Sequence, residues 1–111
     1  MSEWVNMVKE RLGSEDQMQK NYYANFERTA GFIVMSNKKL LFIEEKGFLH
    51  KTHNIILEIP YEKIREIAIV DPYKLAITDV EGKRHTFSIE AGASWVEAGL
   101  RELMPVPGAT P

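Results

Sequence analysis

The spacing of hydrophobic residues changes twice along this chain, and each change predicts a different kind of element. Near the start, apolar residues at three- and four-residue spacing predict a short amphipathic helix with one apolar face, formed by Trp4, Val5, Val8 and Leu12. Ser2 is expected to cap this helix, and Gly13 is expected to end it. The polar stretch 14–20 has no periodicity and is expected to link the helix to the main domain.

From Asn21 onward the pattern has a period of two, which predicts β-strands. Turn-forming pairs recur at Ala30-Gly31, Ser36-Asn37, Lys46-Gly47, His53-Asn54, Asp71-Pro72 and Glu81-Gly82. The β-rich runs between them are 22–29, 32–35, 39–45, 55–59, 65–70, 74–78 and 84–89. About seven strands joined by hairpins predict an antiparallel sandwich or barrel, interrupted at 60–63 because proline cannot donate to a central ladder. The alternation is expected to point five side chains to the core: Ile55, Leu57, Ile59, Leu75 and Ile77.

After Ile89 the helical spacing returns, with an apolar face made of Trp95, Val96, Gly99, Leu100 and Leu103. Ser94 and Glu97 have the spacing of a capping box. This helix is expected to close the mouth of a half-open barrel, with Trp95 as a buried plug and Gly99 allowing a close approach to the sheet. The chain therefore divides into a helix with its linker (1–19), a main domain (20–104) and a tail (105–111) that is expected to be mobile.

Composition narrows the class of protein. The chain has 111 residues, 44% of them hydrophobic and 27% charged, which is typical of one folded domain. Its formal charge of -2 argues against nucleic-acid or membrane binding driven by overall charge, so that any anion site must be a local patch. Without a signal-like start or a long apolar run, the sequence predicts a soluble, cytoplasmic protein.

The sequence offers little for catalysis. It has no cysteine, and it contains no serine-nucleophile elbow, phosphate-binding glycine loop or zinc-binding His-Glu-x-x-His helix. We therefore expect no catalytic residues, no metal and no cofactor, and an enzyme is the least favoured class.

Two segments resemble a known family. The run Gly-Phe-Ile-Val-Met-Ser-Asn-Lys-Lys-Leu-Leu-Phe at 31–42 resembles the G-x-x-x-x-T-N-x-R-L-x-F hairpin of GRAM and prokaryotic pleckstrin-homology-like (PH-like) domains, with Ser36 for threonine and Lys39 for arginine. The run Ile-Pro-Tyr-Glu-Lys-Ile at 59–64 resembles the segment that follows it in those domains. The resemblance covers about 20–104. It implies a half-open barrel closed by one helix and a non-enzymatic module that binds lipid, protein or its own kind; the first helix is an addition.

One segment could form a local basic patch. Residues 46–53 contain no acid, and two large apolar residues lie among basic ones, so a hairpin tip here could meet an anionic lipid surface. The candidate ligand- or lipid-binding residues are Lys38, Lys39, Lys46, Phe48, Leu49, His50, Lys51 and His53. The commoner arrangement is that Phe48 and Leu49 begin the next strand and pack inward. A metal site is not expected at His50 and His53, because residues three apart lie on opposite faces of a strand.

The sequence leaves two functions open. The leading one is a binding or adaptor module for a protein partner or, weakly, for an anionic membrane. The alternative is a homo-oligomer: so short a helix must dock on the outer face of its own sheet, on a second copy or on a partner. Its expected interface in a homo-oligomer is Trp4, Val5, Val8 and Leu12. The second basic group, at 83–85, is expected on a solvated face.

Overall fold

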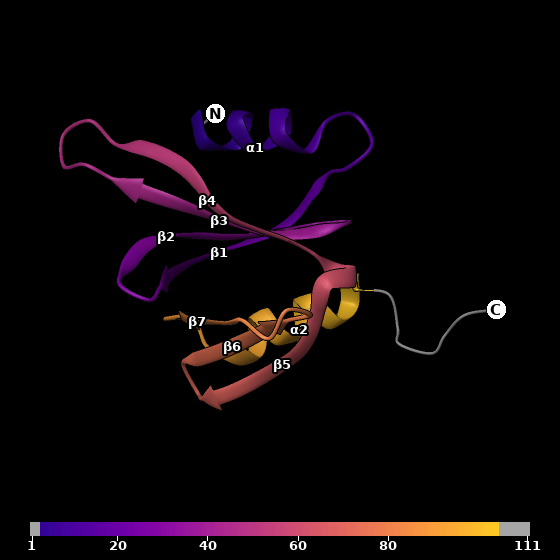
Figure 1. Ribbon diagram of the computed structural model, residues 1–111. Helices are drawn as coiled ribbons and strands as arrows, with labels where there is room; N and C mark the ends of the chain where they lie inside the picture. The colour runs from indigo at the N-terminus through magenta and orange to yellow at the C-terminus, as the bar shows by residue number, and fades with distance from the viewer. Residues whose placement is uncertain (1–2, 105–111) are drawn as a thin grey trace.

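The computed structural model describes residues 3–104 as one β-sheet with two helices (Figure 1). In chain order the elements are α1 (Glu3–Leu12), β1 (Met18–Phe26), β2 (Thr29–Ser36), β3 (Lys39–Lys46), β4 (Thr52–Pro60), the 3-10 turn η1 (Tyr61–Lys63), β5 (Ile64–Asp71), β6 (Lys74–Asp79), β7 (Arg84–Ser88) and α2 (Ala93–Leu103). The expected cap at Ser2 and the expected mobile tail 105–111 lie outside the described residues.

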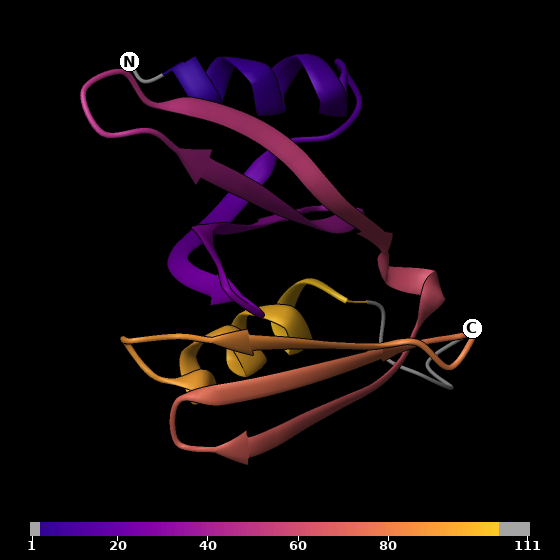
Figure 2. The same cartoon turned by 60° about the vertical axis from the view of Figure 1, so that its left-hand side comes forward.

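The strands form a single antiparallel sheet that folds over on itself. Their order is β4-β3-β2-β1-β7-β6-β5, and β1 pairs with β7 at only two positions, Asn25 with Ser88 and Phe26 with Phe87. This short seam lets the β1–β4 half and the β5–β7 half diverge, and Figure 2 shows α2 lying between them. The expected half-open barrel of seven strands, closed by a C-terminal helix, is confirmed.

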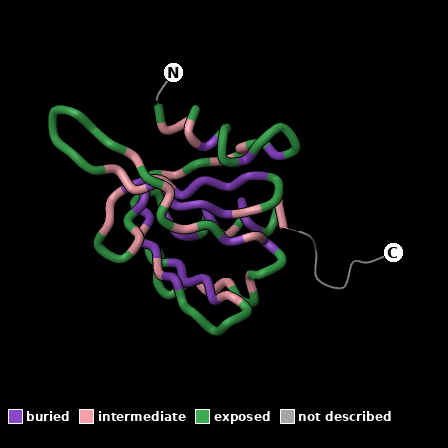
Figure 3. Tube along the Cα trace, turned by 45° about the horizontal axis from the view of Figure 1, so that its top comes forward, coloured by how far each residue is buried: buried purple, intermediate pink, exposed green. Residues whose placement is uncertain are grey.

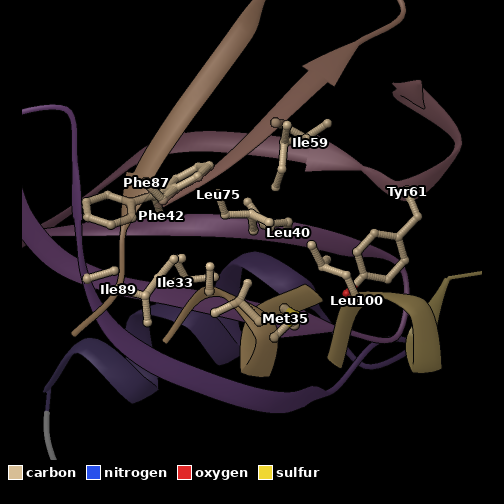
Figure 4. Packing of buried hydrophobic residues seen from close by; sticks show 14 residues of the cluster. Ile33, Met35, Leu40, Phe42, Ile59, Tyr61, Leu75, Phe87, Ile89 and Leu100 are labelled. Atoms are coloured by element: carbon tan, nitrogen blue, oxygen red, sulfur yellow. The ribbon is translucent and has the colours of Figure 1, made fainter. Parts of the chain in front are cut away.

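The apolar residues form two separate cores because the β1–β4 half is covered on both faces. The inner core packs between the two halves and α2 (Figure 4) and includes Ile33, Met35, Phe42, Leu75, Ile77, Phe87 and Leu100. The outer core packs under α1 and consists of Val8, Leu12, Val34, Leu41 and Ile43. A strand buried on both faces reads as a continuous apolar run, which is why 31–35 and 40–43 show so little alternation.

Two of the expected turns lie inside strands. His53 and Asn54 belong to β4, and the expected turn at Ala30 and Gly31 is wrong because both residues lie within β2. The β1–β2 turn instead falls at Glu27, whose φ is 58°. Gly31 is required for another reason: a Cβ atom there would collide with the backbone carbonyl of Ile43 on β3.

A slip in the β3–β4 register changes the direction of one expected core residue. Phe42 pairs with Leu57 but Ile43 pairs with Ile55, so that β4 has one extra residue at this point. Leu57 and Ile59 therefore pack against the inner core as expected. Ile55 packs against the outer core, because residues on either side of a bulge point to opposite faces.

Helix α2 closes the barrel with a different face from the one expected. Its buried residues are Ala93, Val96, Gly99 and Leu100, whereas the side chain of Trp95 is 63% exposed. The plug role of Trp95 is therefore wrong, because one residue along a helix turns the side chain by about 100° away from Val96. The capping box is also wrong: the N-cap is Gly92, which makes no side-chain cap.

The close approach at Gly99 agrees with the expectation. A Cβ atom on this glycine would lie 2.9 Å from Met35 Cε and 3.0 Å from Lys20 Cδ. Both residues belong to the β1–β2 pair, so the glycine allows the helix to pack directly on the sheet.

Candidate functional site

The β3–β4 hairpin extends beyond the rest of the sheet and ends in an exposed loop (Figures 1 and 3). We call residues 46–53 the β3–β4 tip. Phe48 is 90% exposed and Leu49 is 84% exposed, so the alternative in which they begin β4 and pack inward is wrong. Gly47 has a φ of 108°, and a Cβ atom there would collide with the carbonyl of His50; this tight turn keeps the apolar pair out of the strands.

Acidic residues just below the tip pair with its cations. Lys46 Nζ lies 3.6 Å from Glu44, and Lys51 Nζ lies 3.2 Å from Glu45. His53 Nε2 also lies 3.1 Å from Glu45. Burial alone would raise the pKa of Glu45, but hydrogen bonds from His53 and Lys51 outweigh it and hold that pKa below its ordinary value. The tip is therefore an apolar projection with a balanced set of charges at its base.

The other two candidate lysines lie far from this tip. Lys38 is in the β2–β3 turn and Lys39 begins β3, so both lie at the opposite end of β3, about 25 Å away for a strand of this length. Lys39 Nζ lies 2.7 Å from Glu58, which also pairs with Arg11 at 3.2 Å. The structure thus separates the candidate binding residues into two groups, and only the tip group surrounds exposed apolar side chains.

The two histidines of the tip are not arranged as metal ligands. His50 is exposed in the loop, whereas His53 on β4 lies against Glu45 and the ring of Phe32. Within residues 3–104, no group of three or more His, Cys, Asp or Glu side chains is placed to hold a metal ion.

A buried carboxylate that sequence reasoning missed lies in the expected linker. Asp16 is nearly buried and accepts hydrogen bonds from the Ser36 hydroxyl (2.8 Å), the Asn37 N–H (3.0 Å) and the Gln17 N–H (2.8 Å). The available signal was the Ser36-Asn37 pair, whose turn needs an acceptor from elsewhere in the chain. Gln17 directly precedes β1, whereas Ser36 and Asn37 lie at the β2–β3 turn. By accepting hydrogen bonds from all three, Asp16 holds the start of β1 against that turn.

Tyr61 completes this network from the other family-like segment. Its hydroxyl donates to the Ser36 carbonyl at 2.6 Å, and its N–H donates to the Lys38 carbonyl at 3.0 Å. Burial, and then the negative charge of Asp16, raise the pKa of the Tyr61 hydroxyl. The two segments that carry the family resemblance therefore meet in one hydrogen-bonded cluster, in which Asp16 and Tyr61 both bond to Ser36.

His85 is buried, so its expected place on a solvated face is wrong. On β7, His85 and Phe87 point to the same inner face, and the Phe26 ring lies beside both. His85 Nε2 lies 3.1 Å from Asp79 Oδ2, while its Nδ1 has no partner among the described residues. The hydrogen bond with His85 is the largest of the effects that lower the pKa of Asp79.

Helix α1 docks on the outer face of its own sheet. The Trp4 ring stacks on Phe32 with centroids 4.6 Å apart, Val8 is fully buried and Leu12 is nearly so. Val5 is half-buried. The residues predicted as an oligomer interface are thus largely engaged within the chain, on the first of the three docking positions left open for this helix, the outer face of its own sheet.

Neither a protein-family model nor a curated protein matches this chain. Both helices within residues 3–104 fall short of the length and apolar content needed to cross a membrane. The most distinctive part of the described surface is the β3–β4 tip, with its exposed Phe48 and Leu49.

Proposed function

We propose that this chain is a non-enzymatic, PH-like binding module that makes weak peripheral contact with an anionic membrane through the β3–β4 tip. The observation that carries this proposal is the exposure of two adjacent large apolar side chains, Phe48 and Leu49, at the end of a projecting hairpin. Lys46, His50 and Lys51 surround them, so that phosphate-binding groups would lie at headgroup level when the apolar pair enters the acyl boundary.

The apolar pair would supply most of the affinity. Full burial of a phenylalanine or leucine side chain is worth about 1.5 to 3 kcal/mol each. A lysine near an anionic surface contributes about 1 kcal/mol, but Glu44 and Glu45 sit beside Lys46 and Lys51 and offset part of that gain. The expected contact is therefore weak, and only modestly dependent on salt.

The carboxylates that accept several hydrogen bonds support a role other than catalysis. Both oxygens of Asp16 accept hydrogen bonds that hold the β2–β3 turn. The carboxylate of Asp79 holds the β6–β7 turn by accepting from the Glu81 and Lys83 N–H groups, and it also binds His85. These carboxylates act as fixed acceptors that hold turns, which fits a binding module better than an enzyme.

Vesicle sedimentation tests the membrane proposal. With phosphatidylcholine vesicles that contain phosphatidylserine, the double variant Phe48→Ser/Leu49→Ser should bind at least about tenfold more weakly than the wild type. The double variant Lys46→Glu/Lys51→Glu should show a smaller loss that shrinks as salt rises. The matched control is Val80→Ser, which removes an apolar side chain that is 51% exposed beside the far end of β4 and should bind like the wild type.

Two outcomes would contradict the proposal. The first is a wild type that does not sediment with these vesicles, which would leave a protein partner as the ligand of the tip. The second is an equal loss in Val80→Ser and in the tip variant, which would show that exposed apolar area in general, and not the tip, drives the binding.

A further inference from the structure

The three histidines of the chain differ in how far solvent reaches them. His50 is exposed in the β3–β4 tip, and His53 at the base of the tip is half-buried. His85 is buried on β7, and its Nδ1 is the only buried side-chain nitrogen or oxygen without a hydrogen-bond partner among residues 3–104. The Nδ1 atom of His53 is not closed off in this way. The two histidines that can exchange a proton with solvent therefore both belong to the tip.

The fixed charges around the tip cancel as long as its histidines are neutral. Within 44–53 two acids, Glu44 and Glu45, stand against two lysines, Lys46 and Lys51. Each lysine Nζ is paired with one of these carboxylates, at 3.6 Å for Lys46 and 3.2 Å for Lys51. A segment without net charge gains little from an anionic surface, so the apolar pair at its end has to bind almost unaided.

Glu45 is the acid that both a lysine and a histidine contact. Its Oε1 lies 3.2 Å from Lys51 Nζ, and its Oε2 lies 3.1 Å from His53 Nε2. Burial acts to raise the pKa of Glu45, but the hydrogen bonds from His53 and Lys51 outweigh it, so that the carboxylate stays ionised in mildly acidic solution.

This geometry decides where an added proton goes. An ionised carboxylate can only accept a hydrogen bond, so neutral His53 donates its Nε2–H to Glu45 and takes up a further proton at Nδ1. One carboxylate then faces two cations, His53 and Lys51. The base of the tip thereby gains a positive charge that no acid in 44–53 balances.

The other elements packed around His53 add no net charge. Strand β2 contributes the ring of Phe32, whose centroid lies 6.5 Å from that of His53, and it contains no charged residue. Helix α1, which packs on β4, contains two acids and two bases. Of these, Glu10 and Arg11 line a groove along the neighbouring part of β4 and have opposite charges. The net charge of this region therefore changes with its histidines.

We propose that mildly acidic solution strengthens the contact of the tip with an anionic membrane through protonation of His50 and His53. This inference rests on the proposed membrane function and adds its regulation. Histidine is the side chain that ordinarily gains its charge between pH 8 and 5. Over this range the charges within 44–53 change from two acids against two bases to two acids against four bases. Each added positive charge near an anionic surface tightens binding about fivefold.

Vesicle sedimentation at about pH 7.5 and about pH 5.5 tests this regulation. Phosphatidylglycerol is the suitable anionic lipid, because its phosphodiester keeps its charge between these two values. The wild type should bind vesicles that contain it about tenfold more tightly at the lower pH, and the gain should shrink as salt rises. Vesicles of phosphatidylcholine alone have no net charge, so no such gain is expected with them.

Histidine variants identify the groups responsible. The double variant His50→Gln/His53→Gln should bind equally at the two pH values, because it keeps no titrating group in the tip. Since His53 contacts Glu45, thermal melts must show that this variant is folded. The single variant His50→Gln changes only an exposed loop residue and should by itself lose part of the gain.

A permanent charge tests the same mechanism at neutral pH. His50→Lys should bind about fivefold more tightly than the wild type at about pH 7.5. The matched control Val80→Lys adds the same charge at an exposed position in the β6–β7 connection and should bind like the wild type. Equal tightening by both lysines would show that overall charge, and not the tip, controls binding.

The possible failures separate this inference from the membrane function on which it rests. A wild type that binds phosphatidylglycerol vesicles equally at both pH values overturns the regulation and leaves the membrane function standing. A wild type that binds at neither pH overturns both. A full gain in the folded double glutamine variant, or an equal gain on phosphatidylcholine alone, also overturns the regulation, because a group outside the tip or an effect other than charge would then cause it.

Discussion

At the scale of single residues, the most consequential group is a carboxylate in a stretch without pattern. Asp16 satisfies the Ser36 hydroxyl and the Asn37 N–H, both of which lie in the turn that the family resemblance singled out. Nothing in the spacing of residues 14–20 indicates a buried acid, because a polar residue becomes an acceptor only when tertiary folding brings donors to it. The turn itself could be predicted from Ser36-Asn37, but its acceptor could not.

Replacing Asp16 should therefore be costly. In Asp16→Ala the Ser36 hydroxyl and the Asn37 N–H lose their acceptor, and we expect the free energy of unfolding to fall by about 2 to 4 kcal/mol. The control is Glu15→Ala, an exposed neighbour, which should change stability by less than about 0.5 kcal/mol. Urea denaturation measures the free energy of unfolding of both variants. Equal losses in the two would show that the hydrogen bonds of Asp16 do not stabilise the fold.

The Asp79–His85 pair predicts how stability responds to acid. Because the pKa of Asp79 is lower in the folded protein than in the unfolded chain, its ionised form contributes stability above about pH 4. That contribution disappears as the pH falls through the lowered pKa. Asp79→Asn should therefore be less stable than the wild type at neutral pH but show a flatter decline between about pH 5 and 2. Denaturation at a series of pH values checks this, and parallel profiles would contradict it.

At the scale of elements, both helices follow their predicted spans more closely than their predicted contacts. The period of apolar residues placed α1 and α2 well, because that signal is local. What each apolar stripe covers was less well predicted. For α1 the sequence left three docking positions open, and the helix packs on one of them, the outer face of its own sheet, whereas α2 turns the expected plug Trp95 outward. Several neighbouring residues can belong to the apolar face of a helix. Only the position of the sheet decides which of them are buried and which lie at the exposed margin of that face.

This difference predicts opposite results for two substitutions in α2. Trp95→Ala should lower the free energy of unfolding by less than about 1 kcal/mol, because the ring is mostly exposed. Leu100→Ala should cost about 2 to 5 kcal/mol, because Leu100 is fully buried in the inner core. Thermal or urea unfolding of the pair decides the matter. A larger loss for Trp95→Ala would restore the plug role that the sequence suggested.

At the scale of the whole molecule, the barrel presents two separate exposed apolar features at a distance from its inner core. One is the β3–β4 tip, and the other is the β5 edge with the neighbouring Tyr73 and Trp95. The two features lie in opposite halves of the sheet.

The sequence by itself determined the seven strands, the two helices and the exclusion of cysteine chemistry, because periodicity, turn residues and composition act locally. It also indicated the β3–β4 tip, although it favoured packing Phe48 and Leu49 inward. Only the tertiary structure decided that these two side chains stay in solvent, that Asp16 meets Ser36 and that β5 forms one edge of the sheet. The physical reason is that burial, hydrogen-bond partners and free edges depend on residues far apart in the chain, and strand order brings those residues together.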